Sequence, residues 1–222
     1  MPTKLPKDAI KALYGAGKAR ADMTMDVLVI QSLMAGIYIG MATHLLLAIG
    51  GGVIGAVFFP IGLLGILLTS AELFTGDILI FLPSVLSGHV SWTSVLRNWS
   101  VSWFGNMAGC LLWAYFIVYL PGSLEDIGKN EFAIKVALAK ANQTWGSIFL
   151  KGVGANFMVC LAIWQATCAE EVTGKLIAIF LPLSGFVLMG LDHCIANQFI
   201  IRKLLFLWIV LVLEEICEPT SL

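Results

Sequence analysis

The distribution of charged residues constrains this chain more than any other feature of its sequence. No Asp, Glu, Lys or Arg occurs between Asp26 and Glu72, and four more uncharged stretches follow at residues 78–96, 98–124, 152–169 and 176–191. A helix crosses the apolar core of a bilayer in about 20 residues, so the first stretch has room for two spans and each later one for about one. Only 12% of the residues are charged, against about 25% in soluble domains. The sequence therefore predicts an integral membrane protein.

The lengths of these stretches favour membrane helices over the strands of a barrel, because no alternating ten-residue pattern is present. The fold class predicted is therefore all-α. We expect membrane helices near residues 27–49, 53–88, 99–120, 147–168 and 175–201. A short amphipathic helix is also expected between the third and fourth of these, at residues 131–141.

The N-terminal residues 1–26 carry basic side chains that alternate with apolar ones. No short apolar run with a cleavage site follows, so this segment is not a secretory signal. The pattern indicates an amphipathic segment on the membrane surface, with a frayed tail as the alternative. Positive charge is retained on the cytoplasmic side of membrane proteins, so we expect the N-terminus in the cytoplasm. The basic residues that precede the first span are Lys4, Lys7, Lys11, Lys18 and Arg20.

Composition and motifs argue against several classes of function. A net charge of −1 argues against a nucleic-acid partner. No group of His, Cys and carboxylates has the spacing of a zinc site, and neither a phosphate-binding GxxxxGK[ST] loop nor a GxSxG nucleophile motif occurs. We therefore expect no metal, no cofactor, no catalytic residues and no enzymatic activity. The cysteines form no CxxC pair and are expected to be small apolar residues, at Cys110, Cys160, Cys168, Cys194 and Cys217.

Two of the expected helices contain ionisable residues at a depth where charge is costly. Glu72 and Asp77 lie in the second expected helix, and Asp192 and His193 lie in the last. Glycines and small polar residues accompany both pairs and weaken the helices there. Freed backbone groups are tolerated at this depth only inside protein or along a water-filled passage. The two interruptions lie at matching places in two halves of the chain, which indicates an inverted repeat with a transport site between the halves.

We expect different roles for these ionisable residues. The carboxylates of Glu72 and Asp192 are expected to cap the broken helices by accepting hydrogen bonds from backbone N–H groups. A cap does not require His193, and imidazole can exchange a proton or donate to an anion near physiological pH. We therefore favour a functional role for His193. His44, near the end of the first helix, and His89, in a loop, are expected to be structural.

Three motifs, in order along the chain, resemble those of the formate/nitrite transporter family. They are ELFTG at residues 72–76, NFMVCLAIW at residues 156–164 and GLDHCIAN at residues 190–197. The resemblance runs from the basic N-terminal segment to about Ile201. It implies an aquaporin-like bundle of six helices with two interrupted helices in an inverted repeat, assembled as a homopentamer in the lipid bilayer. It also implies transport of small monovalent weak-acid anions, such as formate, nitrite, lactate or hydrosulfide, usually together with protons.

The resemblance also implies a role for individual residues. His193 matches the central histidine of the pore and faces Thr75, and Lys140 matches a vestibule lysine that precedes a pore asparagine, Asn156. One apolar constriction is implied at Phe59, Val159 and Phe186. A second is implied at Leu63 and Leu73.

These residue types suit the transport of weak acids on physical grounds. A bare anion cannot cross an apolar ring cheaply, because it must give up its hydration in a medium of low dielectric constant. With the N-terminus in the cytoplasm, Lys129, Lys135 and Lys140 lie on the outside of the membrane, where they would concentrate anions at the entrance of the pore. Desolvation then raises the proton affinity of the anion. The anion takes a proton from bulk water or through His193, and the neutral acid passes the constriction.

The sequence departs from the family at two places. Asp192 occupies a position where Glu is more usual, which shortens the reach of the carboxylate. After Arg202 and Lys203 only ten apolar residues follow, which is too short for a span. We therefore expect the sixth helix to be missing or incomplete. The predicted organisation is a cytoplasmic segment at 1–26, a transmembrane transport domain at 27–201 and an atypical segment at 202–222.

Several alternatives remain beside proton-linked anion transport across a plasma or bacterial inner membrane. A truncated, non-transporting member of the family is one, motivated by the short C-terminal segment. A neutral-solute channel of the aquaporin type is another, but it would carry two Asn-Pro-Ala motifs, and this chain has only Ala196-Asn197 without the proline. A membrane enzyme that uses Asp192 and His193 as acid and base lacks a nearby nucleophile or metal set.

Overall fold

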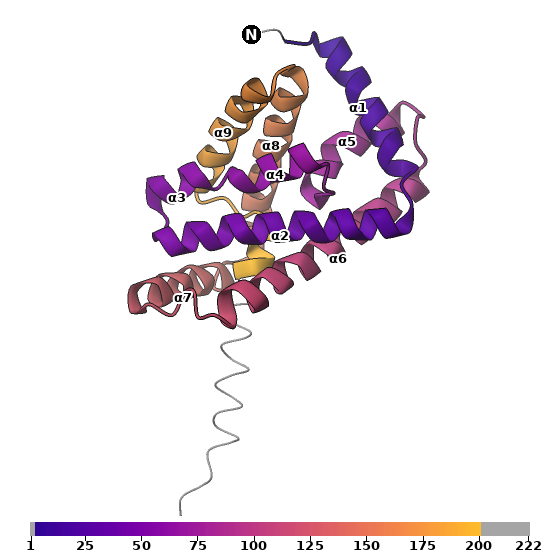
Figure 1. Ribbon diagram of the computed structural model, residues 1–222. Helices are drawn as coiled ribbons and strands as arrows, with labels where there is room; N and C mark the ends of the chain where they lie inside the picture. The colour runs from indigo at the N-terminus through magenta and orange to yellow at the C-terminus, as the bar shows by residue number, and fades with distance from the viewer. Residues whose placement is uncertain (1–2, 201–222) are drawn as a thin grey trace, which may run out of the picture.

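The computed structural model describes residues 3–200, and these residues form a bundle of helices (Figure 1). The elements are α1 Pro6–Ala21, α2 Met25–Ile49, α3 Gly52–Phe58, α4 Ile61–Thr69, α5 Phe74–Leu86, α6 Trp92–Trp113, the π-helical segment η1 Ala114–Tyr119, α7 Ile127–Ala141, α8 Trp145–Cys168 and α9 Val172–Leu188. Residues 194–200 are again helical. The expected sixth helix and the segment 202–222 lie outside the described residues.

Within the described residues, four helical stretches are long and apolar enough to cross a membrane. They are Met25–Ile49, Gly52–Thr69, Trp92–Tyr119 and Trp145–Cys168. The apolar helices α5 and α9 are shorter, because the chain is interrupted after α4 and after α9. The membrane helices predicted from the charge distribution are therefore present, together with the short helix expected at 131–141.

The expected helix at 53–88 consists of three pieces. The first division, at Phe59–Pro60, follows from proline, which has no N–H to donate to the preceding turn. The second is the predicted interruption, where Ser70 adopts a left-handed conformation and residues 71–73 have no regular structure. The last expected helix is interrupted in the same way, at residues 189–193 between α9 and the helix at 194–200.

The helices repeat along the chain at a constant interval of 120 residues. Met25 and Trp145 begin α2 and α8, Gly52 and Val172 begin α3 and α9, and the helices after the two interruptions begin at residues 74 and 194. The repeat extends to α1 and α7, which end at Ala21 and Ala141 and lie near opposite ends of α2 (Figure 1). Two halves with opposite placement form the inverted repeat that was predicted from Glu72 and Asp192.

Small residues allow α2 and α6 to pack closely. A Cβ atom built on Gly109 would lie 2.0 Å from the carbonyl oxygen of Leu33, and one built on Gly36 would lie 2.1 Å from that of Asn106. Glycine at both positions lets the two backbones touch, as is common between membrane helices.

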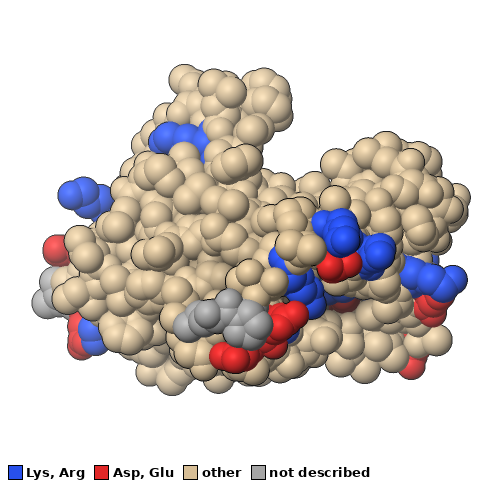
Figure 2. All heavy atoms as spheres, turned by 90° about the horizontal axis from the view of Figure 1, so that it is seen from above, with Lys and Arg blue, Asp and Glu red and all other residues tan. Residues whose placement is uncertain are grey.

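The N-terminal helix α1 packs on the bundle and is not a frayed tail. Its residues Ala9, Leu13 and Gly17 are buried, and Ser84 of α5 donates a hydrogen bond to the Leu13 carbonyl. Most of the surface seen from above is uncharged, and the charged side chains gather in a few groups (Figure 2). A surface with so few charged groups fits a chain surrounded by lipid.

Candidate functional site

His193 and Thr75 come together at the two helix interruptions, although 118 residues separate them. Both are buried, and His193 Nε2 lies 3.0 Å from Thr75 Oγ1. The backbone N–H of Ala196 donates to His193 Nδ1 at 3.2 Å. Since Nδ1 accepts this bond, the proton of the neutral imidazole lies on Nε2 and is donated to Thr75. The Thr75 hydroxyl then retains its own hydrogen for another acceptor.

A cavity of about 200 Å³ opens beside His193. Phe59 and Phe186 line it, with ring centroids 5.4 Å apart in an edge-to-face arrangement, and the ring of Phe186 is 6.0 Å from the ring of His193. Lys140 of α7 lines the same cavity. The structure thus places the lysine, the two phenylalanines and the histidine around one space.

Lys140 is anchored by the carboxylate of Asp192. Its Nζ donates to Asp192 Oδ1, and only 19% of its side chain is exposed. Gln143 and Asn197 also donate to this carboxylate, at 3.0 and 3.1 Å, and Lys151 Nζ lies 4.0 Å from it. Two ammonium groups therefore face one carboxylate, which leaves net positive charge beside the cavity.

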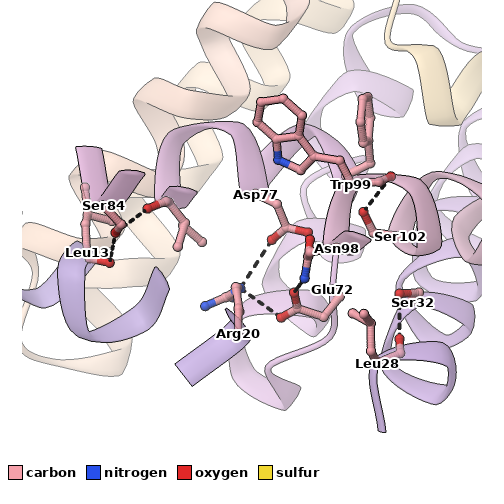
Figure 3. Close-up of polar contacts among 12 residues, drawn as sticks. Leu13, Arg20, Leu28, Ser32, Glu72, Asp77, Ser84, Asn98, Trp99 and Ser102 are labelled. Carbon is pink, nitrogen blue, oxygen red and sulfur yellow. Dashed lines mark hydrogen bonds and ion pairs between the residues drawn. The ribbon is translucent and has the colours of Figure 1, made fainter. Parts of the chain in front are cut away.

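The first interruption is held by a second buried network (Figure 3). Arg20 Nε at the end of α1 lies 2.8 Å from Glu72 Oε1 and 3.2 Å from Asp77 Oδ1. Asn98 of α6 donates to Glu72 Oε2 at 2.9 Å. Asn106, two turns further along α6, donates to the backbone carbonyl of Glu72 and accepts from the N–H of Phe74. Side chains from α1 and α6 therefore satisfy the groups that the break would leave unpaired.

The expectation that Glu72 and Asp192 cap the broken helices is wrong. Among the described residues, the first N–H of α5, that of Phe74, is donated to Asn106 and not to Glu72. Both carboxylates accept from side chains of other helices. The physical reason is their burial, since a buried charge needs a charged partner more than it needs a backbone N–H group. Arg20 supplies this partner for Glu72, and Lys140 supplies it for Asp192.

The remaining expected site residues are not joined to His193 by hydrogen bonds in the described part of the chain. Asn156 lies half-buried on α8, where its Nδ2 faces Cys160 Sγ at 3.6 Å and its buried Oδ1 has no hydrogen-bond partner among the described residues. Val159, Leu63 and Leu73 are buried in the same apolar cluster as Phe59 and Phe186. The sequence-expected constriction residues therefore occupy one core.

Arg20, Asn98 and Asn106 belong to the site but were not singled out in the sequence. Asn98 and Asn106 lie eight residues apart in an apolar helix, so they share one face, and both are fully buried. Two asparagines on one face of an apolar helix could have indicated a buried polar site from the sequence. Arg20 looked like one of several basic residues of the N-terminal segment.

The other lysines of α7 are more exposed than Lys140. Lys129 pairs with Asp126 in the first turn, and this hydrogen bond lowers the pKa of the Asp126 carboxyl. Lys135 is exposed. Lys140 is the lysine of α7 that lines the cavity.

Comparison with known proteins places these features in a family. Residues 7–214 match the family described as Formate/nitrite transporter. Formate-nitrite transporter 3 of Toxoplasma gondii is 32% identical over 212 residues, and the match covers 88% of this chain and 42% of that protein. Formate-nitrite transporter 2 of the same organism is 33% identical, with 46% of its length covered. The chain therefore spans less than half the length of these two relatives.

Solved structures resemble the fold. An FNT family ion channel superposes with a TM-score of 0.80 at 28% identity, covering 87% of this chain and 81% of that one. A pentameric formate channel with formate bound gives a TM-score of 0.68 at 31% identity, covering 78% and 71%. Such channels have the aquaporin-like fold that the sequence motifs implied. The chain belongs to the formate/nitrite transporter family of transporters and channels.

Proposed function

We propose that this protein carries small monovalent weak-acid anions, formate first among them, across a membrane together with a proton. The observation that supports this most is that Lys140 and His193 line the same cavity, and that the buried His193 is hydrogen-bonded to Thr75. The bound formate in the related pentameric channel favours formate, and its assembly favours a homopentamer. Nitrite, lactate and hydrosulfide are further candidates of the same chemical class.

The proposed mechanism separates capture from passage. The net positive charge of Lys140 and Lys151 over Asp192 attracts the anion into the cavity. As the anion leaves water it becomes more basic and takes a proton, either from water or through His193 and Thr75. The neutral acid then passes the apolar core around Phe59, Phe186, Val159, Leu63 and Leu73. A neutral acid avoids the large desolvation cost that an ion would meet there.

The proposed orientation rests on the basic N-terminal segment. The basic segment at 1–26 favours a cytoplasmic N-terminus. In that orientation the cavity lined by Lys140 opens to the outside, and the membrane is the plasma membrane or a bacterial inner membrane. The transport domain is residues 27–201.

Uptake of labelled formate into proteoliposomes at a series of external pH values tests the capture step. Lys140→Gln should reduce uptake at low formate concentration by about tenfold, because it removes the charge that concentrates anions. Lys129→Gln is the matched control, since it removes a lysine of the same helix that does not line the cavity. Equal uptake by both variants would contradict a role for Lys140 in capture.

The same assay tests the central pair. His193→Ala should slow uptake by roughly fivefold or more, because it leaves the buried Thr75 hydroxyl without its partner at 3.0 Å and an unpaired buried hydroxyl costs about 1–3 kcal/mol. Uptake by the unchanged protein should rise as external pH falls, because a proton is a co-substrate. Uptake that ignores both pH and His193→Ala would refute the proposed mechanism.

A further inference from the structure

A second small cavity lies at the other end of α8. It encloses about 180 Å³ and is lined by Lys4, Leu67, Ala166, Thr167 and Lys175. The start of α8 is close to the Asp192 interruption, since Gly152 and Gly154 face Asp192 and Leu191. Ala166 and Thr167 lie in the last turn of the same helix. None of the five lining residues takes part in the networks around Glu72 and Asp192.

The cavity continues the path along which the expected constrictions lie. On α4, Leu67 follows Leu63 by four residues, and on α8, Ile163 follows Val159 by four. Residues four apart share one face of a helix. Leu67 and the pair Ala166–Thr167 therefore lie about one turn beyond the buried Leu63 and Ile163, on the side away from Phe59.

The internal repeat supports this placement independently. Leu46 and Val187 line the cavity beside His193. The residue 120 positions after Leu46 is Ala166, and the residue 120 positions before Val187 is Leu67. Both of these equivalent residues line the second cavity. In an inverted repeat, equivalent positions lie at opposite ends of the pathway between the halves. The two cavities thus share equivalent lining positions, at Leu67 and Ala166 in the second.

The N-terminal segment brings one of the two lysines to this cavity. Thr3 forms a β-bridge with Ala169, and the N–H of Lys4 donates to the carbonyl of Cys168 at 2.8 Å. Lys175 comes from the first turn of α9, and both lysines are half-buried. Among residues 3–200, no carboxylate lies within 4.0 Å of either ammonium group. Glu170 and Glu171 line a neighbouring cavity.

We propose that Lys4 and Lys175 form an anion-binding vestibule at the end of the pathway opposite Lys140. Two half-buried lysines at a space of about 180 Å³ suit one small monovalent anion, whose charge they neutralise without competition from a carboxylate. Lys4 then belongs to the transport pathway as well as to the segment that precedes α1. The assignment of this anion as a transported one rests on the proposed function.

A binding titration tests the vestibule without requiring transport. The full protein, reductively methylated with ¹³C so that lysine charge is kept, is placed in nanodiscs of phosphatidylcholine alone and titrated with sodium formate at constant ionic strength with gluconate. The methyl signals of Lys4 and Lys175, assigned through Lys4→Gln and Lys175→Gln, should shift together and saturate. The signal of the exposed Lys7 is the control. Shifts no larger than that of Lys7 would overturn the proposal.

Two further outcomes are decisive. If the shifts require phosphatidylglycerol in the nanodisc and ignore formate, the lysines bind a lipid headgroup and the vestibule is refuted. If formate shifts both signals but proteoliposomes show no formate flux, the vestibule stands and the proposed transport function fails.

The transport assay separates the two ends. Lys4→Gln and Lys175→Gln should raise the half-saturating formate concentration at the N-terminal face at least about threefold and leave that of the opposite face unchanged. Lys140→Gln should do the reverse, and Lys7→Gln should change neither. Equal effects on both faces from Lys4→Gln would contradict the assignment.

Discussion

The two helix interruptions differ in the number of cationic side chains and carboxylates that meet there. At the first, one guanidinium, Arg20, faces two carboxylates, Glu72 and Asp77. At the second, two lysines face the single carboxylate of Asp192. Removing one partner of a buried ion pair is more damaging than the pair's net contribution suggests, because the remaining charge has no partner.

This balance makes Arg20 a sensitive position for stability. Arg20→Gln should lower the free energy of unfolding by about 3–5 kcal/mol, since it leaves two buried carboxylates near each other. Asp77→Asn in the same protein should recover part of this loss by removing one of the charges. The buried Oδ2 of Asp77 has no hydrogen-bond partner among the described residues, so Asp77→Asn alone should cost less than Arg20→Gln.

Thermal unfolding of the detergent-solubilised protein measures these differences. Lys18→Gln is the control, because the Lys18–Asp22 pair on the same helix is about 70% exposed on both sides and such pairs contribute about 0–1 kcal/mol. Equal losses for Arg20→Gln and Lys18→Gln would show that Arg20 does not hold the interruption.

At the level of the helices, the close crossing of α2 and α6 supports the first interruption. Asn106 of α6 bridges α2 and the break, donating to the carbonyls of Ser32 and Glu72 at 2.7 and 2.8 Å. It can do so because Gly109, one turn away, lies against the α2 backbone at Leu33. Separation of the two helices would pull Asn106 from both acceptors.

Gly109→Ala should therefore destabilise the protein by about 1–3 kcal/mol. Its new Cβ would lie 2.0 Å from the Leu33 carbonyl oxygen, and a backbone atom cannot rotate away as a side chain can. Gly128→Ala on α7 is the matched control, because nothing lies within 4 Å of the added Cβ. Melting temperatures measured in one detergent compare the two, and a loss no greater than that of the control would be inconsistent with the packing described.

Much of this element structure could be predicted from the sequence. Charge-free stretches identified the spans, and Glu72 and Asp192 identified both interruptions. These signals are strong because a charge or an unpaired backbone group has a high free-energy cost in the lipid core. The pairing of Arg20 with Glu72 could not be predicted, since it depends on how α1 folds back on α5. The division at Pro60 was also missed, because hydropathy does not change there. The placement of Thr75 beside His193 came from the family resemblance and is present in the structure.

At the scale of the whole molecule, the repeat relates the two charged networks. Arg20 and Glu72 are separated by the same 52 residues as Lys140 and Asp192. In each half, the helix that precedes the first span supplies the cation for the carboxylate of the interrupted span. Two such halves form an apolar core between two cavities, and each cavity is lined by lysine. This arrangement fits the proposed capture of an anion at either end and the proposed passage of a neutral acid between them.

The most direct test of this account is whether formate crosses without carrying charge. Proteoliposomes are loaded with a pH indicator, and the membrane potential is set with potassium and valinomycin. Initial uptake of labelled formate should be the same at inside-negative and inside-positive potential, with one proton appearing inside for each formate. Protein-free liposomes give the background from unassisted formic acid. Uptake that increases at inside-positive potential without internal acidification would show that the bare anion crosses, and would contradict the account.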